Sequence, residues 1–339
     1  MVRPLLLANF ARIVGGGELG LLELAGELDH RGLQPVVAVP GEGDFADAAR
    51  DAKLDVRIIP EALPDAARRL RPLAAEAELV HATGARGLMA AFMARAHKPL
   101  IWHVRVASRD KMDPFLMRLP DLVIANSRAT AQRFAGRARV RVIYNGVREP
   151  RPAPIPLPLL PDSRRIGVIG RMTPEKGHLD LVPVLGEVLE RRSDIQIVFA
   201  GDDSGRIGDA IRAFADSRGP SVLRLGVVDN MADHVGELDL VVIPSLVEGF
   251  SRVAAEALRS GVNVLARRVG GLIEVLSPLS DPWLPDDRRS WADAIIRELD
   301  SPSHTSEELK GYGARFDPGR HADGVVQAYE SLVRSSPPA

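Results

Sequence analysis

Two glutamates, Glu248 and Glu256, stand eight residues apart in the most informative stretch of the chain. The pattern there predicts an apolar strand, Leu240–Pro244, a short loop that carries Glu248, and a helix, Ser251–Ser260. Both carboxylates can therefore face a ligand held beyond the end of the strand. Each carboxylate can accept hydrogen bonds from two hydroxyls, so the pair suits a sugar or a ribose. A merely solvated Glu256 does not fit, because the helix around it is nearly all Ala, Val and Leu.

Two cations, Arg171 and Lys176, stand between another expected strand, Arg165–Arg171, and an expected helix, Gly177–Arg191. Fixed positive charges at this point suit a diphosphate, which gains negative charge as it leaves a sugar. An ordinary turn with solvated charges explains these two residues equally well when they are considered alone.

A cluster of glycines, Gly15–Gly20, follows the first expected strand, Pro4–Phe10, and opens an expected helix, Glu18–His30. Glycines at such a place let backbone N–H groups approach a phosphate. The spacing Gly-x-Gly-x-x-Gly, with Glu42 further along, also matches the dinucleotide fingerprint of NAD-dependent oxidoreductases and sugar-nucleotide epimerases. A tight turn without a ligand is a third interpretation.

These groups are positioned by short β-branched runs that alternate with amphipathic stretches of about 10–15 residues, a pattern typical of βαβ units and parallel sheets. The remaining expected strands are Gln34–Val39, Val56–Ile59, Leu79–His81, Leu100–His103, Leu122–Ala125 and Val140–Tyr144 in the first half, and Ile195–Ala200, Val222–Leu225, Val262–Arg267 and a weak strand at Trp283–Pro285 in the second. Further helices are expected at Arg86–Ala96 and Pro318–Arg334.

A proline-rich stretch, Glu149–Ser163, separates the two series of elements. Its six prolines exclude a helix or a central strand and predict a semi-rigid linker. We therefore expect an α/β fold of two doubly wound domains, residues 1–150 and 164–316, with a linker at 151–163 and a last helix in 317–339. Ligands of such sheets bind beyond the carboxyl ends of the strands, so two facing sheets would place the site in the cleft between them.

Composition excludes several classes of protein. A chain of 339 residues suits two domains, and the lack of cysteine excludes a disulfide scaffold, a thiolate metal site and a cysteine nucleophile. The net charge of −1 gives no reason to expect nucleic acid as a partner. No apolar run reaches the roughly 18–20 residues of a membrane-spanning helix, and the N-terminus predicts a strand and a glycine turn rather than a signal peptide. We expect a soluble intracellular protein.

Positive charge is concentrated between Arg86 and Arg148, where 13 Lys and Arg residues accompany three acids. Arginines spread over a solvated surface explain this excess as well as a single basic face does. If Arg105, Arg109 and Lys111 line one face, they predict an anionic acceptor. The alternative is that this face docks on an anionic membrane surface.

Several motifs occur in a fixed order along nearly the whole chain. They are GGGEL, DLVIANS (Asp121–Ser127), VIYNGV (Val142–Val147), GRMTPEKG and EGFSRVAAEALRSGVNVLARRVGG. Together they resemble the retaining glycosyltransferases of the GT-B fold, family 4. The resemblance implies two facing Rossmann-like domains, a nucleotide-diphosphate sugar on the C-terminal domain, an acceptor on the N-terminal domain, and a last helix that crosses back to the N-terminal domain. The chain departs from the family pattern at Arg148, where the family often has an acid.

The resemblance also implies roles for single residues. Arg171 and Lys176 would bind the donor diphosphate. Glu256 would hold the ribose hydroxyls, and Glu248 the hydroxyls of the transferred sugar. His103 matches a position beside the donor sugar, although a buried histidine without a ligand is an alternative. The other expected donor contacts are Gly16, Gly17, Gly170, Gly249, Phe250 and Ser251.

Retention in this family is usually described as attack by the acceptor on the face from which the leaving group departs, with a leaving phosphate oxygen taking the proton. Such a reaction needs positioning and electrostatics rather than a carboxylate nucleophile. The chain has no Asp-x-Asp motif, and its eight histidines lack metal-ligand spacing. We therefore expect transfer of a hexose-type sugar without a metal or cofactor, with Arg171 and Lys176 replacing the cation.

Two other functions remain open at this point. The first is an NAD-dependent oxidoreductase or epimerase, which would leave Arg171, Lys176, Glu248 and Glu256 without a role. The second is a non-catalytic protein that binds a nucleotide sugar. The abundance of Arg, Ala and Pro suggests a GC-rich bacterial genome. We expect a role in cell-envelope glycan synthesis (lipopolysaccharide, capsule or exopolysaccharide), with a glycan or lipid-linked acceptor, in the cytoplasm or at the inner face of the membrane.

Overall fold

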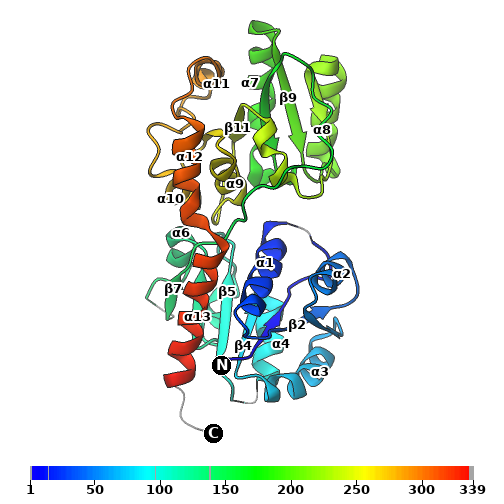
Figure 1. The fold of residues 1–339 in the computed structure, drawn as a ribbon, viewed down its shortest axis with the longest axis vertical. Coiled ribbons are helices and arrows are strands. Elements are labelled where there is room, and N and C mark those ends of the chain that lie inside the picture. The colour runs from blue at the N-terminus through cyan, green and yellow to red at the C-terminus, as the bar shows by residue number, and fades with distance from the viewer. Residues whose placement is uncertain (1, 14, 96, 137–138, 336–339) are drawn as a thin grey trace. The chain divides into compact units, whose positions relative to one another are not determined.

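The computed structural model describes residues 2–13, 15–95, 97–136 and 139–335. The chain divides into two compact units (Figure 1). Unit 1 comprises Met1–Val147 and Phe316–Ala339, and unit 2 comprises Arg148–Arg315. Each unit has its own parallel sheet covered by helices.

Unit 1 contains a seven-stranded sheet with the order β3-β2-β1-β4-β5-β6-β7, and all its paired strands are parallel. The strands are β1 (Pro4–Leu7), β2 (Val36–Pro40), β3 (Asp55–Ile59), β4 (Leu79–Thr83), β5 (Leu100–Val104), β6 (Leu122–Ala125) and β7 (Val140–Val142). The helices are α1 (Gly16–His30), α2 (Asp44–Asp51), α3 (Leu63–Glu76), α4 (Gly84–Ala94), α5 (Asp113–Leu116), α6 (Arg128–Ala131) and α13 (Pro318–Ser335).

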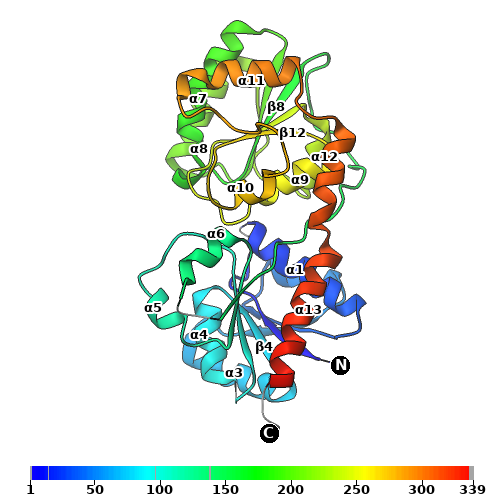
Figure 2. The same cartoon turned by 90° about the vertical axis from the view of Figure 1, so that its left-hand side faces the viewer.

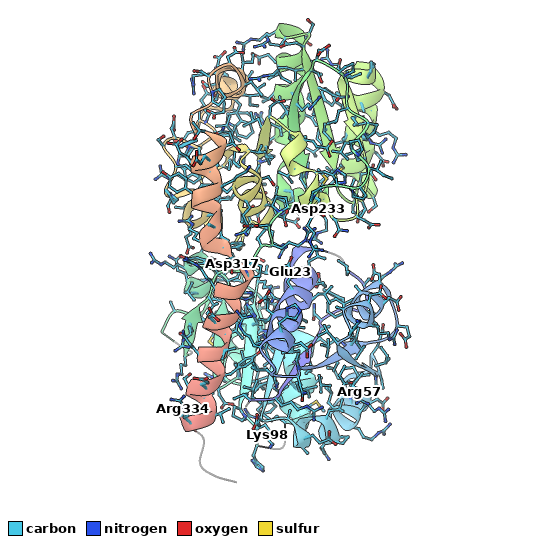
Figure 3. All side chains as sticks on the ribbon, viewed as in Figure 1. Glu23, Arg57, Lys98, Asp233, Asp317 and Arg334 are labelled. Carbon is cyan, nitrogen blue, oxygen red and sulfur yellow. The ribbon has the colours of Figure 1, made fainter. Side chains whose placement is uncertain are left out.

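Alternation along the strands divides the core of unit 1 into two layers. Leu5 and Leu7 of β1 pack with α3, α4 and α5, whereas Leu6 packs with α1, α2 and α13. Figure 2 shows α4 and α13 on opposite sides of this sheet. Helix α13 therefore returns from the end of the chain to complete the core of unit 1, and Asp317 and Arg334 mark its two ends (Figure 3).

Unit 2 contains a five-stranded parallel sheet with the order β10-β9-β8-β11-β12. Its strands are β8 (Arg164–Ile169), β9 (Ile195–Ala200), β10 (Val222–Arg224), β11 (Leu240–Ile243) and β12 (Asn263–Ala266). Its helices are α7 (His178–Arg191), α8 (Gly205–Arg218), α9 (Arg252–Ser260), α10 (Gly270–Leu276), α11 (Trp291–Asp300) and α12 (Ser306–Gly313). Helices α7, α8 and α11 form the core on one face of the sheet.

Both sheets reverse their strand order at one internal position, between β1 and β4 in unit 1 and between β8 and β11 in unit 2. Ligands of doubly wound sheets bind at this switch point, beyond the carboxyl ends of the strands. The expected α/β fold class of two doubly wound sheets is confirmed. A ligand site is therefore expected at each of the two switch points.

Most expected elements differ from the observed ones only at their ends. The weak strand expected at Trp283–Pro285 is wrong, because Trp283 makes only an isolated bridge to Ala266. The first strand ends at Leu7 rather than Phe10, whose side chain is exposed. The end of the helix expected at Arg86–Ala96 falls on a residue outside the described ones, and α4 begins two residues earlier than expected.

Residues 149–163 carry no helix or strand, as their prolines predict. The start of this stretch is held within unit 2, where Arg148 forms a two-point ion pair with Asp233 at 2.6 and 2.7 Å (Asp233 is labelled in Figure 3). In the described part of the chain, no helix combines the length and the apolar character that crossing a membrane requires.

Candidate functional site

A partly buried ion pair at the switch point of unit 2 joins the segments that follow β8 and β11. The ammonium Nζ of Lys176 lies 2.6 Å from Oε1 of Glu248. The hydroxyl of Ser245 donates a second hydrogen bond, of 2.9 Å, to the same oxygen. Glu248 is 8% exposed, so its charge is held in a largely buried place by these two partners.

The backbone brings these two segments into direct contact. Gly177 has a φ of +70°, and a Cβ at this position would lie 2.1 Å from the carbonyl oxygen of Pro244. The backbone N–H of Leu246 donates a 2.8 Å hydrogen bond to the carbonyl of Glu175. Only glycine therefore fits at 177, because a side chain there would separate the loops that carry the ion pair.

A second glycine turn, Val269–Gly271, contacts the loop that carries Glu248. The backbone N–H of Gly271 donates to the carbonyl of Glu248 at 3.0 Å. A Cβ on Gly270, whose φ is +49°, would lie 2.1 Å from that same carbonyl oxygen. The glycine turn Val269–Gly271 thus fixes the position of Glu248.

Glu256 lies on α9, which starts just after the Glu248 loop, and it is half-buried. Its Oε1 accepts from Nε of Arg252, one turn earlier, at 3.3 Å. Ser251 precedes the helix with a φ of +70° and makes no side-chain cap, so the first backbone N–H groups of α9 point out of the helix without that partner. The side chains of Phe250 and Ser251 are buried, and Gly249 is half-buried.

The two remaining candidates in unit 2, Gly170 and Arg171, directly follow β8. Gly170 has a φ of +139°, and its carbonyl oxygen would lie 2.2 Å from a Cβ placed on Gly201. Arg171 is exposed, so it does not join the cluster formed by Lys176 and Glu248.

The sequence analysis missed two hydrogen-bond partners and one buried histidine in unit 2. Ser245 and Arg252 hold Glu248 and Glu256, and both are ordinary polar residues within four positions of their partner, a spacing that could have identified them. His178, the first residue of α7, is 2% exposed. Burial, and then the charge of Lys176, lowers the pKa of His178 to about 4, so this imidazole is neutral at pH 7.

In unit 1 the structure brings Gly17, His103 and Arg105 together. The guanidinium of Arg105 donates from Nη1 to the carbonyl of Gly17 at 2.9 Å, and its Nη2 lies 3.5 Å from Nδ1 of His103. Arg105, which we expected to bind an acceptor, therefore holds the start of α1 against the end of β5. Gly16, at the start of α1, is exposed. Arg109 and Lys111 lie outside this cluster.

His103 is buried, with 1% of its surface exposed. Burial, assisted by the positive charge of Arg105, keeps the pKa of His103 well below 6.5. Nε2 of His81 lies 3.1 Å from Nδ1 of His103, and Nδ1 of His81 lies 2.6 Å from the hydroxyl of Tyr329. Neither His81 nor Tyr329 carried a signal in the sequence, because 248 positions separate them along the chain.

Two arginines of the basic segment between Arg86 and Arg148 are engaged in ion pairs within unit 1. Arg133 pairs with Asp113 in a buried place, and Arg95 pairs with Asp121 at 3.0 Å. Both arginines are thus used in holding the fold. Arg109 and Lys111 are exposed on the loop that leads to α5.

Glu42, the acid of the dinucleotide fingerprint, stands in an exposed turn after β2 and forms a 2.7 Å ion pair with Arg50. The hydrogen bond from Arg50 lowers the pKa of this carboxyl. The observed fold therefore gives Glu42 a partner on α2. Across the described ranges, no group of three or more His, Asp or Glu side chains is arranged to hold a metal ion. Metal independence itself stays a prediction.

Two family models match separate parts of the chain. Residues 14–149 match the model described as Glycosyltransferase Family 4, and residues 163–301 match the model described as Glycosyl transferases group 1. The boundary between them falls in the proline-rich stretch that begins unit 2.

Curated relatives are similar over part of their length. The D-inositol 3-phosphate glycosyltransferase of Segniliparus rotundus is 30% identical over 203 residues, which cover 52% of this chain and 42% of the relative. The lipopolysaccharide core biosynthesis mannosyltransferase LpsB of Rhizobium meliloti is 28% identical over 65% of this chain and 68% of the relative. The chain thus spans less than half the length of the first of these relatives.

Solved structures share the fold along nearly the whole chain. The structure of the Anabaena protein HepE in complex with UDP and glucose matches this chain with a TM-score of 0.82 at 20% sequence identity. The match covers 98% of this chain and 100% of HepE. Sucrose-phosphate synthase from Thermosynechococcus elongatus matches with a TM-score of 0.81 at 19% sequence identity. This match covers 98% of this chain and 100% of the synthase chain. The chain thus carries a family 4 glycosyltransferase domain followed by a group 1 glycosyltransferase domain, on a two-domain fold shared with these solved structures.

Proposed function

We propose that the chain is a retaining glycosyltransferase that moves a hexose-type sugar from a nucleotide-diphosphate sugar to an acceptor hydroxyl without a metal ion. The observation that carries this proposal is the pairing of Lys176 with Glu248 at the switch point of unit 2. A cation and a hydroxyl-accepting carboxylate side by side match the two chemical halves of a sugar diphosphate.

Both members of this pair keep hydrogen-bonding groups that such a ligand could use. Both hydrogen bonds that described residues make to the Glu248 carboxylate fall on Oε1, so Oε2 remains for a hydroxyl of the transferred sugar. Lys176 has three hydrogens and uses one on Glu248, so two remain for phosphate oxygens. In this proposal the exposed Arg171 adds a second charge to the diphosphate, and Glu256 accepts from the ribose hydroxyls. HepE, which was solved with UDP-glucose, supports this donor class.

The proposed step needs no nucleophile from the protein. The acceptor oxygen forms a bond to C1 of the sugar on the face from which the diphosphate departs, and the bond between C1 and the phosphate oxygen breaks. Its electron pair stays on that phosphate oxygen, which also takes the proton of the acceptor hydroxyl. Lys176 and Arg171 stabilise the charge that develops on the diphosphate, which is the role a divalent cation has elsewhere.

A transfer assay tests this function. The protein is incubated with UDP-, GDP- and ADP-sugars and a panel of glycan and lipid-linked acceptors in the presence of EDTA. Release of one nucleoside diphosphate, with a product anomer that matches the donor anomer by NMR, is the expected result. Activity that disappears in EDTA and returns with Mn²⁺ would refute metal independence. A product of inverted anomeric configuration would refute retention. If no nucleoside diphosphate were released from any donor, the proposed function would be refuted.

We also propose an anionic acceptor of the cell envelope, with the protein in the cytoplasm or peripheral at the inner membrane face. The exposed Arg109 and Lys111 support an anionic acceptor, and the named role of LpsB in lipopolysaccharide core synthesis is consistent with the envelope. The double variant Arg109→Ala/Lys111→Ala should raise KM for the acceptor and leave KM for the donor unchanged.

The matched control for this double variant is Arg69→Ala/Arg71→Ala, which removes two exposed charges from α3. Equal effects of the two double variants would refute a specific acceptor contact. Binding of the wild type to anionic vesicles that the first double variant loses, with an unchanged acceptor KM, would assign these charges to the membrane instead.

A further inference from the structure

A cavity of about 260 Å³ lies within unit 2, between the last turn of α9, helix α12 and the start of the proline-rich stretch. Its lining residues are Glu149, Pro150, Arg259, Lys310 and Ala314, and none of them takes part in the proposed donor site. Helices α9 and α12 lie side by side (Figure 2). The volume is many times what one water molecule needs, so the cavity can hold a small ligand.

The wall of this cavity contains a buried cation that its surroundings satisfy poorly. The side chain of Arg259 is 5% exposed. Its Nη1 donates to the carbonyl of Gly313 at the long distance of 3.5 Å, and its Nη2 lies 3.1 Å from Oε1 of Glu149. Within the described ranges, Nε of Arg259 has no hydrogen-bond partner. Because a buried charge is costly unless its donors are paired, an anion that engages more of this guanidinium stabilises it.

Glu149, the carboxylate that pairs with Arg259, is easily displaced. Its side chain is 83% exposed, so water solvates the carboxylate as soon as it leaves. The backbone beside it does not have to move, because the two-point ion pair between Arg148 and Asp233 holds this segment independently. An anion from solvent can therefore take the place of the carboxylate and reach Nη2 from the side on which Glu149 is exposed.

A second cation, Lys310, lines the same cavity from α12. Its side chain passes beside Gly261, since a Cβ on this glycine would lie 3.0 Å from Cε of Lys310. The backbones of the two helices are in close contact, because a Cβ on Gly313 would lie 2.7 Å from the backbone nitrogen of Arg259. The fold thus holds two cations at one cavity. Once Glu149 withdraws, a dianion balances their charge, and a guanidinium matches the oxygens of a phosphate in a two-point contact.

We propose that this cavity is a binding site for a phosphate dianion, free or carried by a small metabolite, which displaces the Glu149 carboxylate and is held by Arg259 and Lys310. Glu149 is the internal competitor that occupies Arg259 when no phosphate is bound. The site lies entirely in unit 2 and uses none of the residues assigned to the nucleotide sugar, so it stands whether or not the proposed function is correct.

The position of the cavity brings such a ligand to both chain segments that connect unit 2 to unit 1. The chain enters unit 2 at Arg148 and leaves it at Arg315. Glu149 lines the cavity from the first segment, and Ala314 lines it from the second. A phosphate that replaces Glu149 therefore removes one attachment of the first segment to α9.

Calorimetric titration of the full chain with inorganic phosphate at about pH 8, where this ion is mainly a dianion, tests the site. Glu149→Gln should bind phosphate about threefold more tightly than the wild type, because the competing carboxylate is gone. Lys310→Gln should bind it about fivefold more weakly, because one of the two cations is lost. Both changes are at exposed positions, so the variants should fold.

Matched controls separate a local contact from a general change of charge. Asp216→Asn and Arg212→Gln remove one acid and one cation from exposed positions on α8 in the same unit, and both should bind phosphate like the wild type. An affinity of Glu149→Gln no higher than that of Asp216→Asn would overturn the proposal. So would wild-type and Glu149→Gln proteins that both fail to bind phosphate.

The donor site could also take up phosphate, and Lys176→Ala distinguishes the two sites. Phosphate binding at the cavity should persist in Lys176→Ala. Binding that disappears in Lys176→Ala and stays normal in Lys310→Gln would assign the ion to the donor site and overturn the proposal. The source of the phosphate follows from a second titration with a hexose phosphate. If it binds more tightly than inorganic phosphate and responds to the same variants, the site takes a phosphorylated metabolite; if it binds more weakly, the site takes the free ion.

Discussion

Lys176 and Glu248 form a 2.6 Å ion pair although 72 positions separate them along the chain. Each follows one of the two strands that flank the switch point of unit 2, and the pair forms because glycine at 177 lets the two loops touch. Glu248 is largely buried, so the loss of its cation would leave a charge with little solvation. The pair is therefore both a structural contact and the proposed donor site.

Replacing Lys176 with alanine should remove on the order of 2–4 kcal/mol of transition-state stabilisation, because the charge of the leaving diphosphate loses a fixed partner. The quantity to measure is kcat/KM for release of the nucleoside diphosphate. Arg212→Ala is the matched control, because Arg212 is an exposed cation of α8 in the same unit. A Lys176→Ala enzyme with the kcat/KM of the control would exclude Lys176 from catalysis.

The Glu256→Gln substitution should weaken binding of the donor nucleotide about tenfold or more, because a neutral amide accepts more weakly from ribose hydroxyls than a carboxylate does. Calorimetric titration with the nucleoside diphosphate gives the dissociation constant. Glu76→Gln, at an exposed position on α3, should bind like the wild type. Normal affinity in the Glu256 variant would make the ribose assignment wrong.

Gly177→Ala should lower the melting temperature by several degrees, since it places a side chain at a φ of +70° and 2.1 Å from the carbonyl of Pro244. The donor affinity should fall with it, because the loops of Lys176 and Glu248 are forced apart. Gly311→Ala is the control, because a Cβ at this helical position has no atom within 4 Å. The control should be neutral or stabilising. Equal melting temperatures for both variants would contradict the close approach at 177.

Acid should destabilise the protein partly through His178. Burial lowers the pKa of His178 to about 4, below its unfolded value of about 6.5, so the unfolded chain binds this proton more readily. The contribution of this group to stability is therefore present above pH 6.5 and is lost as the pH falls toward 4, at about 1.4 kcal/mol per pH unit. Melting temperatures measured between pH 7.5 and pH 5 should fall less steeply for His178→Gln. Parallel curves would show that His178 is not buried in its neutral form.

The sequence allowed the fold class to be predicted, and the positions of Lys176 and Glu248 just beyond strands, because both depend on local signals. Apolar runs followed by amphipathic stretches define the strands and helices. The helix expected to end at Ser260 does so, and Gly261 follows it with a φ of +74°. The grouping of Lys176 with Glu248 follows from topology, because both stand at the ends of neighbouring strands.

Contacts between distant segments could not be predicted in this way. Arg105 holds Gly17, 88 positions earlier, through a geometry that no local pattern encodes, and its expected contact with an acceptor stays a prediction. Tyr329 reaches His81 only because α13 completes the core of unit 1. Residues whose function depends on such packing become visible only in the folded chain.

Thermal unfolding with UDP, GDP, ADP and NAD, each in EDTA, tests the central claim most directly. A ligand at 100 times its dissociation constant stabilises the folded protein by about 2.7 kcal/mol, which raises the melting temperature of domains of this size by several degrees. The account predicts such a rise with one of the nucleoside diphosphates, and a smaller rise in the Glu256→Gln variant. A rise with NAD alone, or no rise with any nucleoside diphosphate, would contradict it.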